Sequence, residues 1–289
     1  MGELAVAFEQ HRPQLVRVAY GVLGSIGAAE DVVQDAWLRL LRVDAGEIDD
    51  LRAWLITVVG RLAMDALKHE QRRRERYIGE WLPEPLVESP ADVTALDEKV
   101  TTALLVVLER LSPAERTAFV LHDVFDIPFE EVAEAVGRSP AAVRQLASRA
   151  RRHVDAGKPR FPASPEEHER IVLAFAGAWR ARDLDQLLAL LDPAVVLRAD
   201  GGGQVASARK PLFGAQRIAR ALVGLQRASA HAGRTIRHGI ADVNGAPGLI
   251  VDDGGVLSVI SLTIDAGRVV AVDIVRNPDK LRHVAAPGA

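Results

Sequence analysis

The chain has 289 residues, a net charge of −3 and no cysteine. This length allows two or three domains with their own cores, and the small net charge requires any nucleic-acid-binding surface to be local. The lack of cysteine excludes disulfides, cysteine zinc sites and thiol catalysis. It fits a reducing cytosol, and because the sequence has neither a signal-peptide pattern nor a bilayer-spanning apolar run, we expect a cytoplasmic protein.

Residues 1–76 predict a compact helical domain with two long amphipathic helices. Apolar residues recur every three or four positions from Ala29 to Leu41 and again from Trp54 to Leu67. The first helix leaves an acidic outer face formed by Glu30, Asp31, Gln34 and Asp35. The second ends in a cationic run of Lys68, Arg72, Arg73, Arg74 and Arg76. These cations either bind an anionic partner or only complement the carboxyl end of their helix.

Residues 77–97 predict an acidic, proline-rich linker, because three prolines in this stretch disrupt helix formation. A plain linker does not need the apolar cluster formed by Tyr77, Trp81 and Leu82. Docking onto a partner and burial against a neighbouring domain explain this cluster equally well.

Residues 98–155 predict a second helical domain. A capping box at residues 112–115 starts one of its helices. Farther on, Phe129–Val136 has the spacing of a short amphipathic helix, Gly137 permits its termination, and Ser139 is placed to cap the next helix. This order of elements is typical of a helix-turn-helix.

The second helix of this motif is basic, since five arginines and no acid occur from Arg138 to Arg152. Its cap and expected outer face comprise Ser139, Arg144, Gln145, Ser148, Arg149 and Arg152. Arginine and glutamine can read base edges, while the other cations hold phosphates. The pattern favours entry into a DNA major groove, and a solvated basic helix in an ordinary bundle is the alternative.

Four motifs in this order resemble the bacterial extracytoplasmic-function sigma factors, the small sigma subunits that contain only regions 2 and 4. They are Ala29–Trp37 (AEDVVQDAW), Arg52–Val59 (RAWLITVV), Leu111–Arg116 (LSPAER) and Ala142–Arg151 (AVRQLASRAR). The resemblance covers about the first half of the chain. It implies binding to core RNA polymerase, through the β′ clamp and the β flap, and promoter recognition at the −10 and −35 elements.

The resemblance also assigns roles to individual residues. The face of Glu30, Asp31, Gln34 and Asp35 would dock on the β′ clamp helices. The −10 element would be bound by Asp49, Asp50, Arg52, Trp54, Arg61, Lys68 and Arg72, together with the rest of the arginine cluster. The helix from Ser139 would read the −35 element, and the acidic linker would follow the RNA exit path. Capture of an extruded base and of a freed strand needs a pocket and nearby cations.

After a linker at residues 156–165, residues 166–289 predict an α+β domain. Helical patterns over 166–181, 183–191 and 215–225 accompany strand-like runs at 195–198, 248–251, 256–264 and 269–275. This combination resembles a SnoaL-like cone of the nuclear transport factor 2 superfamily. The runs Asp200–Gly203 (DGGG), Asn277–Leu281 (NPDKL) and Tyr77–Pro85 (YIGEWLPEP) together resemble the SigJ type of sigma factor, which has such a domain.

The C-terminal domain has two open interpretations. Some SnoaL-like proteins are cyclases with an acid-base aspartate and histidine, and the suggestive residues here are Asp200, Asp273, His231 and His238. An aspartate before three glycines is, however, more typical of a turn. We therefore expect a catalytically silent domain without metal or cofactor that regulates the sigma regions in cis and has a pocket for a small-molecule ligand. A bifunctional protein with a cyclase or isomerase domain is the alternative.

For regulation we expect contact between the linker residues Tyr77, Trp81, Leu82 and Pro83 and two segments of the C-terminal domain. These segments comprise Asp200, Gly201, Gly202 and Gly203, and Asn277, Pro278, Asp279, Lys280 and Leu281. Such a contact would set the placement of regions 2 and 4, whose spacing must match the promoter elements.

Overall fold

The computed structural model describes residues 2–44, 46, 48–74, 77–87 and 100–287. The chain forms two compact units. Unit 1 comprises Met1–Arg76, Ser89–Val100 and Leu104–Lys158, and unit 2 comprises Tyr77–Glu88, Thr101–Ala103 and Pro159–Ala289. The described part of the expected linker, residues 77–87, therefore belongs to unit 2. The rest of that linker, with Pro90, lies outside the described residues, as does Arg76 of the cationic run.

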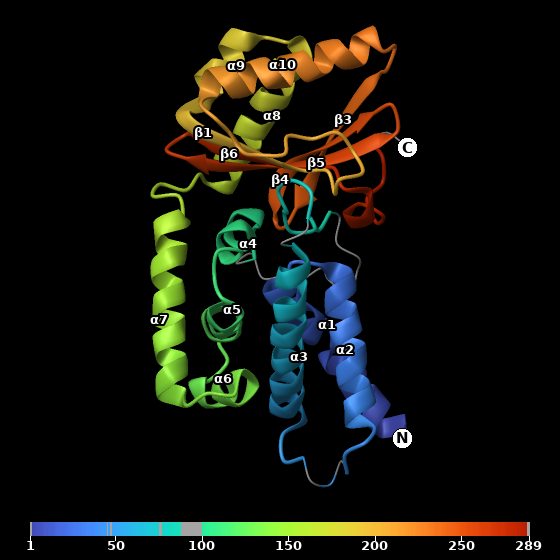
Figure 1. Ribbon diagram of the computed structural model, residues 1–289, viewed down its shortest axis with the longest axis vertical. Coiled ribbons are helices and arrows are strands. Elements are labelled where there is room, and N and C mark those ends of the chain that lie inside the picture. Colours follow the sequence, from blue (N-terminus) through green and yellow to red (C-terminus); the bar gives the residue numbers. More distant parts are fainter. Residues whose placement is uncertain (1, 45, 47, 75–76, 88–99, 288–289) are drawn as a thin grey trace. The chain divides into compact units, whose positions relative to one another are not determined.

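Unit 1 is helical, as its apolar periodicity predicts (Figure 1). Its helices are α1 (Gly2–Leu23), α2 (Ile26–Leu40), α3 (Leu51–Arg74), α4 (Thr102–Leu108), α5 (Pro113–Phe119), a π-helix η2 (Val120–Val124), α6 (Phe129–Val136) and α7 (Pro140–Gly157). The first two residues of α4 are assigned to unit 2. Among the described residues, no helix is long and apolar enough to cross a membrane.

Glycines allow helices of unit 1 to approach one another closely. A Cβ atom at Gly60 of α3 would lie 3.0 Å from Leu121 and 3.1 Å from Ala135 of α6. A Cβ atom at Gly21 of α1 would lie 2.9 Å from Val120. A larger residue at these positions would force the packed side chains apart. The N-terminal helices and the helices after residue 104 thus share one packed interior within unit 1.

The local sequence explains the helix-turn-helix. Gly137 ends α6 in the left-handed conformation, with φ of 69°, which glycine adopts without steric cost. Ser139 caps α7 by accepting a hydrogen bond of 3.3 Å from the backbone N–H of Ala142. The helix then buries Val143, Ala147, Ala150 and Val154 on one face. It continues to Gly157, two residues beyond the expected end of this domain at 155.

Unit 2 is an α+β domain (Figure 1). Its main helices are α8 (Pro165–Ala181), α9 (Leu184–Leu190) and α10 (Ala215–His231). Its strands are β1 (Leu191–Asp200), β2 (Leu212–Phe213), β3 (Ile236–Val243), β4 (Ala246–Asp253), β5 (Val256–Asp265) and β6 (Arg268–Val275), followed by a short 3-10 helix, η3 (Pro278–Lys280). The sheet order is β2-β1-β6-β5-β4-β3.

The expected antiparallel meander is present from β3 to β6, whereas β1 pairs with β6 in parallel. The strand-like runs in the sequence did not include β2 or β3. The β3–β4 hairpin turns at Asn244 and Gly245, both with positive φ, and Asn-Gly is a typical signal for such a turn. This dipeptide could have located the missing hairpin.

Both faces of the sheet bury apolar side chains, and one face also buries an ion pair. One face packs Leu197, Ile260 and Ile274 against the apolar sides of α8, α9 and α10. Alternating residues point the other way, and there Asp273 of β6 receives two hydrogen bonds, of 2.6 and 2.9 Å, from Arg198 of β1. Burial raises the pKa of Asp273, although the charge and hydrogen bonds of Arg198 oppose this.

Candidate functional site

The basic helix α7 presents the residues expected to bind DNA. Arg144, Gln145, Ser148, Arg149 and Arg152 are all exposed, on the side opposite the buried alanines of α7. An arginine-rich outer face combined with an apolar inner face is what a major-groove helix requires.

Two of these arginines have partners on unit 1 itself. Arg144 pairs with Glu130 of α6 at 3.0 Å and lies over the ring of Phe129, 5.1 Å from its centre. Arg149 pairs with Glu115 of α5 at 3.0 Å. Both side chains of the Arg144–Glu130 pair are largely exposed. Replacing Glu130 with a DNA group as the partner of Arg144 therefore costs little free energy.

The acidic face of α2 is open, as the helical spacing predicts. Glu30, Asp31, Gln34 and Asp35 are exposed, whereas Ala29, Val32, Val33, Ala36 and Leu40 are buried. The helix begins at Ser25, whose hydroxyl accepts a hydrogen bond of 3.4 Å from Ala28. These four side chains lie on the exposed face of α2, opposite its buried residues.

The residues expected at the −10 element are spread along α3 and the turn before it. Asp49, Arg52, Arg61, Lys68 and Arg72 are exposed, and Trp54 is half-buried. Asp50 caps α3, since its carboxylate accepts a hydrogen bond of 3.0 Å from the N–H of Ala53. Arg52 donates to Gln14 at 3.3 Å and Lys68 pairs with Asp65 at 2.9 Å.

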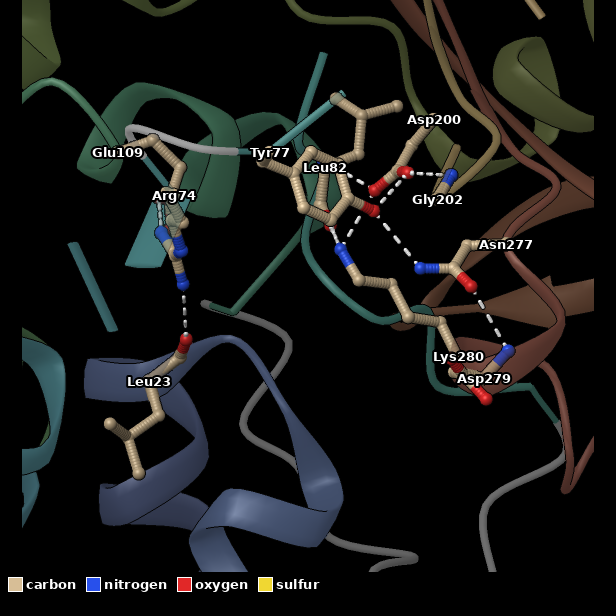
Figure 2. A network of polar contacts seen from close by, with 10 residues as sticks. All are labelled: Leu23, Arg74, Tyr77, Leu82, Glu109, Asp200, Gly202, Asn277, Asp279 and Lys280. Carbon is tan, nitrogen blue, oxygen red and sulfur yellow. Dashed lines mark hydrogen bonds and ion pairs between the residues drawn. The ribbon is translucent and has the colours of Figure 1, made fainter. Parts of the chain in front are cut away.

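Arg74 differs from Lys68 and Arg72, the exposed cations on the same helix. Its guanidinium is mostly buried, pairs with Glu109 and donates to the carbonyl of Leu23 at 3.5 Å (Figure 2). Glu109 also pairs with the fully buried Arg116, which donates to the carbonyl of Gly21 at 3.4 Å. The interpretation of Arg74 as a DNA-binding cation is therefore wrong, because its guanidinium is mostly buried and already paired inside unit 1. Because Arg74 and Glu109 are far apart in the chain, no local sequence pattern predicts that they pair.

In unit 2, Asp200 holds the linker segment Tyr77–Val87 (Figure 2). Its buried carboxylate accepts hydrogen bonds from the hydroxyl of Tyr77 at 2.5 Å, the N–H of Leu82 at 2.9 Å and the N–H of Gly202 at 3.0 Å. Lys280 pairs with the same carboxylate at 2.7 Å and also donates to the carbonyl of Leu82. We call this group the Asp200 cluster.

Other residues of both C-terminal motifs, among them Asn277, Gly202 and Gly203, support this cluster. Asn277 donates to the hydroxyl of Tyr77 at 3.0 Å, and the ammonium of Lys280 lies 3.9 Å from the ring centre of Trp81. Gly202 has a φ of +63°, and a Cβ atom there would lie 2.5 Å from Asn277. A Cβ atom at Gly203, also with positive φ, would lie 3.2 Å from Ile78. These two glycines therefore permit a close approach that no other residue allows.

Much of the described part of the linker is buried, although Ile78 is exposed. Leu82, Leu86 and Val87 are 2%, 3% and 5% exposed, and Pro83 is buried as well. Burial against a neighbouring domain is thus the interpretation that fits the apolar cluster.

A second set of backbone and side-chain contacts fixes the linker, and the sequence analysis did not predict it. Asn244, in the β3–β4 turn, accepts hydrogen bonds from the N–H of Leu86 at 3.3 Å and from the hydroxyl of Thr102 at 3.2 Å. Its own N–H donates to the carbonyl of Leu86 at 2.9 Å, and Val87 forms a β-bridge with Val243.

The four candidates for acid-base catalysis are not assembled around one cavity. Asp200 and Asp273 have the partners described above, and His231 is exposed at the end of α10. His238 lies edge-on against Trp179, with ring centres 5.0 Å apart. A cavity of about 360 Å³ lies between the sheet and α8 and α10, and none of the four lines it. Among the described residues, no cluster of three or more His, Asp or Glu side chains is arranged to hold a metal.

Comparison with known proteins places both helical regions. The model of Sigma-70 region 2 matches residues 7–73, and that of Sigma-70, region 4 matches residues 101–154. The ECF RNA polymerase sigma factor SigJ of Mycobacterium tuberculosis is 40% identical over 287 residues, which is 94% of this chain and 91% of that protein. Probable ECF RNA polymerase sigma factor SigI of the same species is 37% identical, over 96% of this chain and 94% of that protein.

The crystal structure of M. tuberculosis SigJ is similar over the whole length. It covers 98% of this chain and 99% of its own, at 38% identity and a TM-score of 0.79. The expected architecture of two helical sigma regions followed by an α+β domain is confirmed.

Proposed function

The chain belongs to the extracytoplasmic-function RNA polymerase sigma factors, which bind core polymerase and direct promoter-specific initiation of transcription, and we propose that its C-terminal domain regulates this activity in cis. The observation that carries the proposal is the Asp200 cluster. The segment that it holds, Tyr77–Val87, lies in the sequence between region 2 and region 4. A held linker restricts how far the two regions can separate, whereas promoter binding requires a fixed spacing between them.

The individual binding surfaces are part of this proposal. The acidic face of α2 docks on the β′ clamp, and region 4 docks on the β flap. The exposed residues of α7 read the −35 element, and those along α3 hold the −10 element. Their exposure, and the charge of each surface, support these assignments. We also propose a cytoplasmic location, since core polymerase and promoter DNA are there.

The sigma regions are not catalytic, and we propose that the C-terminal domain is catalytically silent as well. Asp200 accepts four donors and Asp273 is paired with Arg198, so neither carboxylate is placed as a general base. A domain of this fold with a cavity suits a small-molecule ligand that biases the sigma regions. No observation favours the cyclase or isomerase alternative.

Run-off transcription with core polymerase tests the regulation. Deletion of Asn277–Ala289 and the substitution Trp81→Ala should each change the amount of transcript from a cognate promoter without changing promoter choice. Combined, their effects should not add, because both release the same linker contact. Lys280→Met should act likewise, and Lys210→Met, an exposed lysine of the same domain, is the matched control.

Additive effects, or unaltered transcription in both Trp81→Ala and the deletion, would refute regulation through the linker. Turnover of a small molecule by a protein that gives no transcript from any cognate promoter would instead support the enzymatic alternative.

A further inference from the structure

The cavity of the C-terminal domain has a mostly apolar wall. Six of its lining residues are Trp179, Leu197, Leu222, Leu225, Ile260 and Ile274. Its volume of about 360 Å³ is within the range of small-molecule sites, roughly 300–1,000 Å³. The wall therefore fits the hydrocarbon body of a small ligand.

One end of the cavity is polar, lined by Ser207, Asp253, Ser258 and Arg276. The carboxylate of Asp253 accepts hydrogen bonds from Ser229 at 2.9 Å and from Arg234 at 3.0 Å. Asp253 and Arg276 are the charged side chains that line the cavity, and Asp253 already has Arg234 as its cationic partner.

Arg276 is the side chain at this end of the cavity that can bind a ligand. Its Nε donates to Ser258 at 3.1 Å and its Nη1 donates to the carbonyl of Ala206 at 2.8 Å. Among the described residues, no acceptor forms a hydrogen bond with its Nη2. Burial lowers the pKa of Arg276, while the charge of Asp253 opposes this, so the guanidinium is poorly solvated and favours a further anion.

We propose that this cavity binds a small amphipathic monocarboxylate, with its hydrocarbon body against the apolar wall and its carboxylate on Arg276. This proposal specifies the chemical class of the ligand in the proposed function. Its regulatory role rests on that proposed function. A guanidinium matches a carboxylate in geometry and charge, whereas an alcohol gains less there and an amine is repelled.

The same arginine connects the cavity to the Asp200 cluster. Its backbone N–H donates to the carbonyl of Asp200 at 2.7 Å, and the next residue, Asn277, holds Tyr77. Ala206, which accepts from its side chain, is in the loop that begins with Gly201. A carboxylate on Nη2 adds a contact without breaking these bonds. Ligand binding therefore orders this loop and strengthens the hold on the linker segment.

Isothermal titration calorimetry on the full chain tests the ligand class with octanoate, octanol and octylamine as probes. Octanoate should bind at least tenfold more tightly than octanol, and octylamine should not bind. Arg276→Gln should weaken octanoate binding at least tenfold and leave octanol binding unchanged. Arg237→Gln, an arginine on β3 that does not line the cavity, is the matched control. Leu225→Trp fills the cavity and should weaken binding of both octanoate and octanol.

Equal binding of octanoate and octanol by the unmodified chain would overturn the carboxylate assignment, even if Arg276→Gln fails to fold. Absence of octanoate binding would overturn the ligand class. Hydrogen exchange then tests the connection, because octanoate should slow exchange in residues 77–87, and unchanged or faster exchange contradicts it. The transcription tests of Trp81→Ala and the deletion use no ligand, so they succeed or fail independently of these measurements.

Discussion

The hydroxyl of Tyr77 donates a 2.5 Å hydrogen bond to the carboxylate of Asp200, although 123 positions separate the two residues in the chain. Asp200 is completely buried, so its charge depends on the four donors of the Asp200 cluster. Two of these donors, Tyr77 and Leu82, belong to the linker segment. Folding of the C-terminal domain and capture of the linker are therefore coupled through one carboxylate.

Replacement of Asp200 should loosen the linker. Asp200→Ala removes the carboxylate that pairs with the buried ammonium of Lys280 and should destabilise the C-terminal domain by about 3–5 kcal/mol. Asp200→Asn keeps an acceptor and should cost about 1–3 kcal/mol. Urea unfolding measures the loss, and hydrogen exchange at Leu82 should accelerate. Asp192→Asn, an aspartate at the start of the same strand, is the control. Unchanged exchange at Leu82 in Asp200→Ala would exclude Asp200 as the anchor.

Arg144 should specify the promoter. Arg144→Ala should cost about 1–3 kcal/mol of discrimination at the −35 element, because a bidentate contact to a base is lost. Fluorescence anisotropy with matched and mismatched duplexes measures this difference. Glu130→Gln removes the intramolecular partner and should not weaken binding. If Arg144→Ala leaves affinity and promoter choice unaltered, the assigned face of α7 is incorrect.

Arg152 should act on DNA without regard to sequence. Arg152→Ala should weaken binding uniformly and lower the slope of log affinity against log salt by about 1, since one phosphate contact is lost. Titrations at several salt concentrations measure the slope. A change in sequence preference in this variant would contradict a phosphate contact.

The acidic face of α2 should be required for assembly. Asp31 and Asp35 are exposed, so replacing both with lysine should preserve the fold. It should abolish assembly with core polymerase, because cations then face the basic groups expected there. Pull-down of core polymerase together with circular dichroism measures both effects. Normal pull-down by the folded double variant would refute this surface.

Glu109 should be a main determinant of the stability of unit 1. Glu109→Gln leaves the guanidinium groups of Arg74 and Arg116 without their carboxylate and should destabilise unit 1 by about 3–5 kcal/mol. Denaturant unfolding measures the loss, with the exposed Glu134→Gln as the control. A loss no larger than that of the control would show that Glu109 does not balance the two arginines.

Much of this architecture follows from the amino-acid sequence by itself. The exposed acidic face of α2, the buried alanines of α7 and the cap at Ser139 depend on residues three or four positions apart. Helical spacing decides which of these side chains face inward, so the sequence alone determines them. The order of the motifs likewise indicated two sigma regions followed by an α+β domain, and the comparisons agree.

Only the tertiary structure decided which residues that are distant in the sequence come into contact. No local rule pairs Asp200 with Tyr77, or Asn244 with Leu86, because the partners are more than 100 residues apart. Arg74 belongs to the same cationic run as the exposed Lys68 and Arg72, yet the position of Glu109 makes it a buried structural residue. A buried charge needs a partner, and the tertiary fold determines which residue that partner is. The polar end of the cavity arises in the same way, since β4, β5, the residue after β6 and a loop each contribute one side chain.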